Sequence, residues 1–558
     1  MSIVQSKIYW CKACNVPLVQ EVCDVCATTG SRVASDIRPV FPQEQRLIEI
    51  LLRMPIGSFR GKSLWDTSGN RLLIDGQASL VFNKGELMKI EPAYIRWQLE
   101  LYPTIAEDEI EHQGILDRYV ACNKSRLQEI EYDAISVMMG KAKEFAAQRI
   151  AGDVEKPLHV ISFSGGKDST VVFDLVKRHY AGVGEVIGVF GDTTLELPET
   201  LDYVKRVQRA NRIPIRQEKS RKNFFELSER IGPPSRVMRW CCTIFKTGPI
   251  NKLYERWSRK SGLAQSIITY YGIRACESAR RKAYDPITES PKVARQIVAS
   301  PIFYWGDADI WLYILSHKLD FNGTYRLGFS RVGCWCCPAN SLWSGFLCRV
   351  YFPALAEPWR NFLVGFAQRM GKPDAENYVD DGKWKARQGG QGLDSAQKSI
   401  LSSRPCGDDP HARTYDLTRP ITPELFEYFK PFGLIDQWRG RSILGEVFVL
   451  SQRTKEPILL LQGVMGSKDL RVKVVSHSNP ALLLKWVDCQ MRKFQSCELC
   501  TGCVAICPQG AIFNHPGSSD QRYTIDSSRC TNCLECVTHF DTGCLVSKAL
   551  KVRKGTTI

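Results

Sequence analysis

The sequence predicts an α/β protein built on a parallel sheet, with small cysteine-rich domains beside the sheet. Between residues 156 and 345, short apolar runs that look like strands alternate with helical stretches, which is the pattern of β-α-β units. Cysteines gather in tight Cys-x-x-Cys groups near both ends of the chain, which is typical of metal or cluster ligands in a reducing compartment. The 558 residues suffice for several domains of roughly 100–200 residues each.

We expect five segments along the chain. Residues 1–35 form a zinc ribbon, residues 36–150 form an α+β domain of unknown role, and residues 151–345 form the catalytic parallel-sheet domain. Residues 346–480 form a helical and small α/β extension, and residues 481–558 form a ferredoxin-like α+β domain.

The composition favours a globular chain with an anionic partner. Hydrophobic residues make up 44% and charged residues 24%, so a packed core is expected and wholesale disorder is excluded. Lys and Arg number 75 against 59 Asp and Glu, a net charge of +16, which favours nucleic acid or nucleotide phosphates as partners. No apolar run approaches the ~18 residues of a membrane span, and the first ten residues lack the features of a signal peptide. We therefore expect a cytoplasmic protein without a membrane partner.

A glycine-rich loop follows the first strand-like run of the catalytic domain. The run LHVISF leads into Ser-Gly-Gly-Lys-Asp-Ser-Thr and then into a helical stretch. Gly165 and Gly166 let the backbone approach a phosphate without a Cβ clash, and N–H groups at the helix start point at the anion. Asp168 follows Lys167 where the P-loop of ATPases has Ser or Thr, so this loop is of another kind; an ordinary glycine turn is the alternative. Hydroxyl donors are available from Ser162, Ser164, Ser169 and Thr170.

The stretch from Ser162 to Ser169 resembles the pyrophosphate loop of the PP-loop ATP pyrophosphatases, and the chain around it resembles their phosphoadenylyl-sulfate (PAPS) reductase-like branch. The resemblance covers about residues 156–340 and implies a parallel-sheet core of the adenine nucleotide α-hydrolase type. Four further motifs of that branch occur in order, in the stretches Asp192–Thr200, Gly272–Arg281, Pro301–Trp311 and Gly333–Pro338.

The resemblance implies ATP binding and cleavage between the α and β phosphates, which gives AMP, pyrophosphate and an adenylylated intermediate. Lys167 and the loop amides would hold the pyrophosphate, and Asp168 or Asp192 would hold Mg²⁺. Arg274 and Arg281 would clamp phosphate or sulfate oxygens, with a salt bridge as the alternative for each. The implied nucleotide-binding residues are Ser162, Ser164, Gly165, Gly166, Lys167, Asp168, Ser169, Thr170, Asp192, Thr193, Gly272, Arg274, Glu277 and Arg281; the expected catalytic residues among them are Lys167, Asp168, Asp192 and Arg274.

A first iron–sulfur site is implied inside the catalytic domain. The pair Cys241 and Cys242, with the distant Cys334 and Cys337, matches what the resemblance implies for the 4Fe–4S cluster of assimilatory adenylyl-sulfate reductases. Thiolates suit iron, whereas adjacent cysteines are awkward ligands for tetrahedral zinc, the alternative. Cys336 leaves open which thiols of this group serve as ligands.

The C-terminal segment has the cysteine spacing of a bacterial two-cluster ferredoxin, in which the fourth cysteine of each run ligates the other cluster. A zinc module is the alternative, and Cys489 is a rival to Cys544. The function implied is a relay of low-potential electrons to the catalytic domain. One predicted 4Fe–4S ligand set is Cys497, Cys500, Cys503 and Cys544, and the other is Cys530, Cys533, Cys536 and Cys507.

The N-terminal cysteines have zinc-ribbon spacing. A Cys₄ set closes a structural zinc site and supplies folding energy to a unit too small for its own core; a rubredoxin-like iron is the alternative. The predicted zinc ligands are Cys11, Cys14, Cys23 and Cys26. The complete set of expected cofactors is ATP, Mg²⁺, Zn²⁺ and about three 4Fe–4S clusters.

Two departures from the PAPS reductases favour sulfur transfer driven by ATP. Their loop is generally degraded, whereas this loop keeps every residue of the Ser-Gly-Gly-Lys-Asp-Ser pattern, and their Glu-Cys-Gly nucleophile motif does not occur in this sequence. We expect an adenine nucleotide substrate, a DNA or tRNA acceptor for thiolation or phosphorothioation, and a cysteine desulfurase or another protein that donates sulfur or electrons. The alternatives are a PAPS or adenylyl-sulfate reductase that forms sulfite with the fused ferredoxin, and an electron-transfer subunit that only senses nucleotide.

Overall fold

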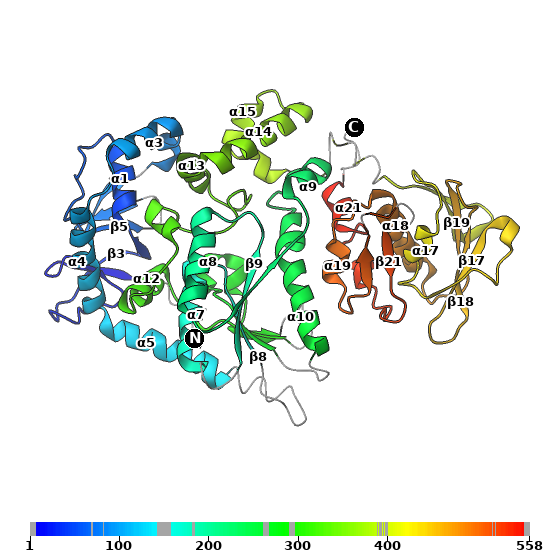
Figure 1. The fold of residues 1–558 in the computed structure, drawn as a ribbon, viewed down its shortest axis with the longest axis horizontal. Helices are drawn as coiled ribbons and strands as arrows, with labels where there is room; N and C mark the ends of the chain where they lie inside the picture. Colours follow the sequence, from blue (N-terminus) through cyan, green and yellow to red (C-terminus); the bar gives the residue numbers. More distant parts are fainter. Residues whose placement is uncertain are drawn as a thin grey trace. The chain divides into compact units, whose positions relative to one another are not determined.

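A computed structural model describes most of the chain, and the described part divides into two compact units (Figure 1). The first unit comprises Met1–Gly191, Leu195–Glu218 and Ser261–Trp359, and the second comprises Asp192–Thr194, Lys219–Lys260 and Arg360–Ile558. The described residues are 7–67, 71–81, 83–141, 158–180, 185–260, 267–289, 296–387, 389, 393, 396, 400–515, 517–518 and 521–551.

The first unit is organised around a six-stranded sheet in the order β10-β9-β8-β11-β13-β12. Strand β8 pairs in parallel with β9 and β11, and β11 pairs in parallel with β13, whereas β12 runs antiparallel to β13. The α/β class with a parallel sheet, predicted from the alternating apolar runs, is confirmed. The strands are β8 (Leu158–Ser162), β9 (Val186–Asp192), β10 (Ile215–Lys219), β11 (Ile267–Tyr270), β12 (Ile287–Glu289) and β13 (Gln296–Ala299).

Strand β8 is central, and its apolar residues are buried, as expected for a strand covered on both faces. The chain from β8 leads through helix α7 (Lys167–Tyr180) to β9 on one side, while β11 lies on the other side. The strand order therefore reverses between β8 and β11, and such a switch point opens a crevice at the carboxyl ends of the strands. The glycine loop that follows β8 lies at this switch point.

Two smaller sheets and a set of helices complete the first unit. A three-stranded sheet has the order β2-β1-β3, and a four-stranded antiparallel sheet has the order β4-β5-β6-β7. The strands are β1 (Ile8–Cys11), β2 (Val16–Leu18), β3 (Ser31–Ala34), β4 (Ile37–Pro39), β5 (Leu64–Thr67), β6 (Arg71–Ile74) and β7 (Gln77–Val81); the helices are α1 (Pro42–Leu51), α2 (Lys84–Leu87), α3 (Pro92–Leu101), α4 (Ala106–Cys122), α5 (Lys124–Ile135), α8 (Pro198–Ala210), α11 (Ala279–Lys282), α12 (Asp307–Ser316) and α13 (Leu342–Tyr351), with helical turns η1 (Ser136–Lys141), η3 (Ala275–Glu277) and η4 (Gly323–Leu327).

The second unit contains a six-stranded antiparallel sheet in the order β14-β15-β19-β18-β17-β16 and a cysteine-rich part with the hairpin β20-β21. One hydrophobic core joins this sheet to helix α18 (Pro480–Ser496), and Val472, Val487 and Tyr523 are fully buried members of it. The strands are β14 (Ser402–Cys406), β15 (Asp409–Asp416), β16 (Leu434–Asp436), β17 (Glu446–Leu450), β18 (Pro457–Gln462), β19 (Asp469–Val474), β20 (Ile512–Asn514) and β21 (Tyr523–Ile525). The helices are α9 (Phe224–Ile231), η2 (Cys242–Thr247), α10 (Gly248–Lys260), α15 (Ala375–Asp380), η5 (Lys383–Ala386), α17 (Glu424–Glu427), η6 (Ser442–Leu444), α19 (Gly502–Ile506), α20 (Glu535–Thr538) and α21 (Leu545–Ala549), while α14 (Pro353–Arg369) spans the division between the units.

Among the described residues, every helix is too short or too polar to cross a bilayer.

Candidate functional site

The glycine loop between β8 and α7 is held by its own hydroxyl groups and by close packing. Gly165 has a φ of +71°, a left-handed conformation that glycine adopts without strain, and a Cβ there would come within 2.9 Å of Thr200 Cγ2. Ser169 Oγ accepts a hydrogen bond from the Ser164 N–H at 3.1 Å and donates one to the Gly166 carbonyl at 2.9 Å. The loop is therefore held in this conformation by hydrogen bonds from its own residues and by the space available at Gly165.

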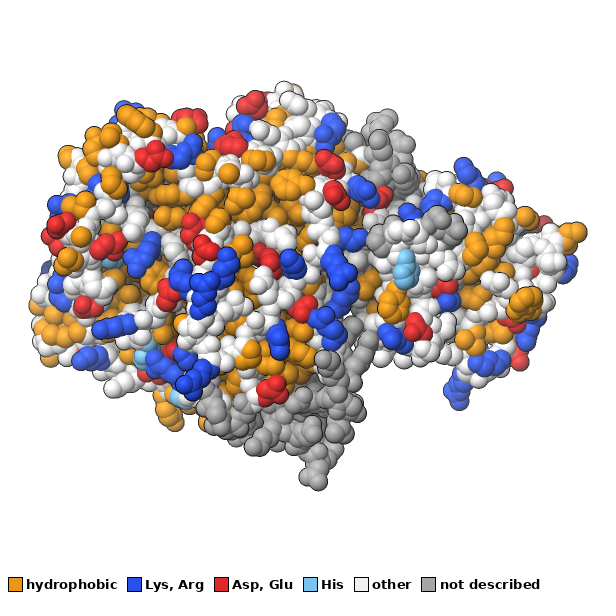
Figure 2. Space-filling view, viewed as in Figure 1, with side chains coloured by type: hydrophobic (Ala, Val, Ile, Leu, Met, Phe, Trp, Pro, Cys, Tyr) orange, Lys and Arg blue, Asp and Glu red, His pale blue; other side chains and the backbone are white. Residues whose placement is uncertain are grey.

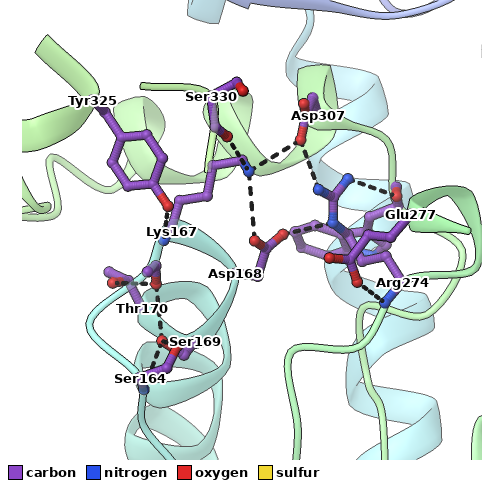
Figure 3. A network of polar contacts seen from close by, with 12 residues as sticks. Ser164, Lys167, Asp168, Ser169, Thr170, Arg274, Glu277, Asp307, Tyr325 and Ser330 are labelled. Carbon is purple, nitrogen blue, oxygen red and sulfur yellow. Dashed lines mark hydrogen bonds and ion pairs between the residues drawn. The ribbon is translucent and has the colours of Figure 1, made fainter. Parts of the chain in front are cut away.

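Two buried cations and two carboxylates form a ring at the start of α7 (Figure 3). Lys167 Nζ lies 3.5 Å from Asp168 Oδ2 and 3.3 Å from Asp307 Oδ1. Arg274 Nε lies 2.5 Å from Asp168 Oδ1, and its terminal nitrogen lies 2.7 Å from Asp307 Oδ1. Each carboxylate thus bridges both cations, and the structure brings together three of the four predicted catalytic residues.

Lys167, Arg274 and Asp307 have pKa values shifted toward their charged forms although all three are buried. Burial opposes the charged forms of Lys167 and Arg274, but Asp168 and Asp307 outweigh burial and raise both pKa values. Burial would raise the pKa of Asp307, but Lys167 and Arg274 lower it to about 2. Lys167 and Arg274 are each 4% exposed, so an anion that reached them would meet cations shielded from water, where electrostatic attraction is strong.

Four residues that hold the site were missed by the sequence analysis. Asp307 belongs to the ring, and Tyr325 Oη accepts the Lys167 backbone N–H at 2.9 Å. Asn322 Nδ2 donates to the Gly165 carbonyl at 3.0 Å, and the Asp36 carboxylate accepts the Asp307 N–H at 2.8 Å. Asp307 lies two residues before Asp309 in the Pro301–Trp311 motif. This position within the motif is the one feature of the sequence that could have indicated a role for Asp307.

The motif that begins at Gly272 packs directly on the start of α7. A Cβ on Gly272 would lie 2.9 Å from the Asp168 carbonyl carbon, so only glycine allows this approach. Glu277 accepts the Arg274 N–H at 3.2 Å and forms an ion pair with Arg281. Burial and Arg331 together lower the pKa of Arg281. Arg281 is thus engaged by Glu277, while Arg274 belongs to the ring.

The remaining predicted nucleotide-binding residues are buried or lie at strand ends. Ser162 is the last residue of β8, and Asp192 is the last residue of β9. Asp192 accepts the Thr194 N–H at 2.7 Å, and Thr193 is 4% exposed. Both Asp192 and Thr193 belong to the second unit, and their role toward Mg²⁺ and the nucleotide stays a prediction.

The N-terminal cysteines lie together as the zinc-ribbon spacing predicts. The Sγ atoms of the four cysteines all lie within 4.8 Å of one another. Cys11 Sγ is 3.4 Å from Cys26 Sγ, and Cys14 Sγ is 3.8 Å from Cys23 Sγ. Four convergent thiols suit tetrahedral Zn²⁺, so this donor set fits the metal that we propose.

Replacing Cys23 with serine is expected to release one zinc ion per chain and to unfold the sheet β2-β1-β3, because the metal supplies folding energy that this small sheet lacks. Metal analysis and limited proteolysis of the N-terminal segment measure the two effects. The matched control is Cys406→Ser, a half-buried cysteine of strand β14. Full zinc content in the Cys23 variant would contradict the assignment.

The cysteines of the first predicted cluster are divided between the units. Cys334, Cys336 and Cys337 belong to the first unit, and Cys241 and Cys242 belong to the second. Burial raises the pKa of the Cys336 thiol strongly, and the charges of Cys334 and Cys337 raise it further. Cys334 and Cys337 are themselves partly exposed. We propose Cys334 and Cys337, the two partly exposed thiols, as the ligands from this loop.

The ferredoxin-like cysteines form two groups. After burial, the charge of Cys544 is among the causes that raise the pKa of Cys497, Cys500 and Cys503. Burial also raises the pKa of Cys489, and the next influence on it is the charge of Arg492. The second group lines a single cavity and consists of Cys507, Cys530, Cys533 and Cys536. Thiolates in two sets of four fit two 4Fe–4S clusters, and we propose these sets as their ligands.

Comparison with known proteins identifies two parts of the chain. Residues 158–340 match the family described as the phosphoadenosine phosphosulfate reductase domain, and residues 496–539 match the 4Fe–4S dicluster domain. The chain is 31% identical over 303 residues to an uncharacterized protein of Methanocaldococcus jannaschii, a match that covers 54% of this chain and 58% of that protein. It is 30% identical over 201 residues to the adenosine 5'-phosphosulfate reductase of Neisseria meningitidis serogroup A, covering 33% of this chain and 73% of the reductase.

Among solved structures, the U34-tRNA thiolase NcsA of Methanococcus maripaludis, with its [4Fe–4S] cluster, aligns with 47% of this chain and 79% of its own. Its sequence identity is 13% and the TM-score is 0.26, and at that score the alignment carries no argument about function. The family match covers residues 158–340, the stretch that contains the loop, the four residues of the ring and the later motifs. The chain therefore belongs to the phosphoadenosine phosphosulfate reductase family of PP-loop enzymes and carries a C-terminal 4Fe–4S dicluster domain.

Proposed function

We propose that this enzyme cleaves ATP to AMP and pyrophosphate and thereby activates a nucleic-acid acceptor for reductive sulfur transfer. An acceptor oxygen attacks the α-phosphorus, the bond between that phosphorus and the α–β bridging oxygen breaks, and pyrophosphate leaves. A sulfur nucleophile from a persulfide donor then replaces the adenylylated oxygen, and AMP leaves. Cleavage of the persulfide S–S bond takes up two electrons, which the dicluster domain would deliver one at a time.

The ring at the start of α7 is the observation that carries this proposal. Lys167 and Arg274 are held by carboxylates from two different segments, and phosphate oxygens that displaced those carboxylates would gain two buried cations as charge grows on the leaving pyrophosphate. Asp168, once released, would be a hard oxygen ligand of the kind that Mg²⁺ prefers. Magnesium would polarise the phosphate oxygens when bound, and the residues present suit it.

Packing within the second unit supports an electron relay. The turn η2 begins at Cys242, and η2 and α10 both contact helix α19 of the dicluster domain. Asn251 Nδ2 donates to the Ala505 carbonyl at 3.0 Å, and a Cβ on Gly248 would lie 2.9 Å from Ala505 Cβ. The segment with the Cys241–Cys242 pair is thus packed against the helix that carries Cys503, which supports electron delivery to this pair.

A basic surface supports a nucleic-acid acceptor. Figure 2 shows Lys and Arg side chains gathered over helix α8 of the first unit. Lys205 and Arg206 of this helix are exposed and are paired with acidic neighbours, and further exposed arginines lie in the last turn of the helix and after it. Cations in a row suit a phosphate backbone. The further exposed arginines are Arg209, Arg212 and Arg216.

The test is pyrophosphate release from ATP by the anaerobically purified chain, measured with tRNA, with duplex DNA and without nucleic acid. We expect release that one of these acceptors stimulates, with sulfur appearing in the acceptor when a persulfide donor is supplied. In Arg209→Glu/Arg212→Glu the stimulation is expected to disappear while acceptor-free release remains. Tight ATP binding with no pyrophosphate under any condition would contradict the proposal and favour a nucleotide sensor.

The reductase of Neisseria meningitidis supports a second candidate function, reduction of adenylyl sulfate or PAPS to sulfite with the dicluster domain as electron source. The same ring would then hold the phosphate and sulfate oxygens of the substrate. Sulfite production from adenylyl sulfate with dithionite, in the absence of thioredoxin, distinguishes this function from the first.

A further inference from the structure

Four cations border the ring without belonging to it. Helix α11 contributes three consecutive ones, Arg280, Arg281 and Lys282, and the fourth is Arg331. Arg280, Lys282 and Arg331 are exposed. Within the described part of the chain, only Arg281 of these four forms an ion pair, and its partner is Glu277. The four cations, here called the rim, therefore offer positive charge that attracts an anionic partner.

Two contacts hold the rim against the ring. Glu277 accepts the Arg274 N–H at 3.2 Å and also pairs with Arg281, so one carboxylate joins an arginine of the ring to an arginine of the rim. Lys167 Nζ donates to the Ser330 carbonyl at 3.4 Å (Figure 3), which places the rim arginine that follows this serine beside the ring lysine. The rim is therefore part of the surface next to a nucleotide held at the ring.

Two exposed tyrosines accompany the rim. Tyr284 is 43% exposed and Tyr304 is 52% exposed. Tyr284 donates its N–H to the Arg281 carbonyl at 3.0 Å, and the carbonyl of Trp305, next to Tyr304, accepts a hydrogen bond from Arg274 at 3.4 Å. The backbone at each tyrosine is thus tied to an arginine of the rim or of the ring. Exposed aromatic rings stack unpaired bases, and nearby cations hold the flanking phosphates.

We propose that the rim and the two tyrosines bind an unpaired stretch of the nucleic-acid acceptor and present one of its nucleotides to the ring. Between residues 278 and 285 there are three cations and one carboxylate, a balance that suits a phosphate backbone. The bases of a duplex are stacked on one another, so only an unpaired strand offers base faces to Tyr284 and Tyr304. This inference rests on the proposed function and narrows the acceptor to a single-stranded segment, such as the loop of a folded RNA or a melted stretch of DNA.

The test is equilibrium binding of short labelled strands to the anaerobically purified full chain without ATP, followed by fluorescence anisotropy. We expect a single strand to bind at least about tenfold more tightly than a duplex of the same length, because stacking on the tyrosines is open only to unpaired bases. Parallel measurements with RNA and DNA single strands distinguish the two sources of the acceptor, and a preference for either supports the proposal. Equal binding of single strands and duplex, or no binding of either, would overturn it.

Arg280→Gln/Lys282→Gln removes two exposed charges of the rim. We expect the slope of the logarithm of affinity against the logarithm of salt concentration to fall by about 1.4, because each phosphate contact to a single strand contributes about 0.7. The matched control is Arg118→Gln/Lys124→Gln, which removes two exposed cations from α4 and α5 and should leave the slope unchanged. An unchanged slope in the rim variant would overturn the proposal. A loss of ATP binding as large as the loss of strand binding would also overturn it, because the rim would then hold the nucleotide.

Tyr304→Leu removes the aromatic ring but keeps an apolar side chain. We expect it to bind single strands about 5- to 100-fold less tightly, the range for the loss of one stacked base, whereas Tyr304→Phe retains the ring and should bind like the wild type. Equal binding by both variants would contradict stacking on Tyr304. Pyrophosphate release is measured in parallel: its absence in the wild type would refute the proposed reaction, while the strand-binding results would decide the role of the rim separately.

Discussion

Lys167→Ala is expected to lower pyrophosphate release by about 100- to 1000-fold, the loss typical when one preorganised electrostatic contact to a transition state is removed. Lys167 is 4% exposed, and its ammonium is held by Asp168 and Asp307 beside the glycine loop. Release is measured under anaerobic conditions with saturating ATP and Mg²⁺. Iron and acid-labile sulfide should stay at the wild-type amount, because the predicted cluster ligands are unchanged.

The matched control for Lys167→Ala lies on the same helix. Lys177 Nζ donates to Asn211 Oδ1 at 2.6 Å, and Lys177→Ala should leave release within about twofold of wild type, since surface contacts away from a site contribute little. Release by Lys167→Ala at more than a tenth of the wild-type rate would show that the loop amides and Arg274 suffice, and would contradict the role given to Lys167.

Gly272→Ala is expected to weaken ATP binding at least tenfold and to lower the free energy of unfolding by about 1–3 kcal/mol, the usual range for an overpacked site. The new methyl group would lie 2.9 Å from the Asp168 carbonyl carbon and 3.0 Å from the Ser169 backbone nitrogen. The atoms it meets are backbone atoms and the Asp168 Cβ, so the start of α7 must shift, and with it the loop and the ring. Equilibrium nucleotide binding and the midpoint of chemical unfolding measure the two effects.

Gly345→Ala is the matched control for Gly272→Ala. Gly345 lies in helix α13, and a Cβ there would meet no heavy atom within 4 Å apart from the neighbouring backbone of its own helix. Because alanine favours the helix over glycine by about 1 kcal/mol, this variant should be slightly more stable than the wild type and should bind ATP normally. Normal ATP binding by Gly272→Ala would mean that α7 need not keep its position, and the ring would lose its proposed role.

The sheet and the loop could be predicted because their signals are local. The run Leu158–Ser162 is apolar and is followed at once by two glycines and a helix, so strand, turn and helix are all determined by neighbouring residues. Arg274 could be predicted only through a motif of the family. Asp307, by contrast, reaches the loop across more than a hundred residues of chain, and no periodicity in the sequence signals that contact.

The same limit explains why the burial of Lys493 escaped the sequence analysis. Lys493 is one of the two lysines of helix α18, and the expected position of a lysine is the surface. The packing of α18 against α20 and α21 turns Lys493 inward, and such packing depends on the whole domain. The Tyr325 and Asn322 contacts to the loop arise in the same way, from a turn that passes near Gly165 only after the sheet has formed.

The contact of α19 with α10 also has a kinetic consequence. Both helices are parts of one polypeptide, so the contact between the proposed electron source and the Cys241–Cys242 segment is intramolecular, with an effective concentration on the order of millimolar. A freely diffusing carrier would have to be present at that level to match it. The turnover number should therefore stay constant when the protein is diluted. A system with a separate electron carrier would lose its activity at the same dilution.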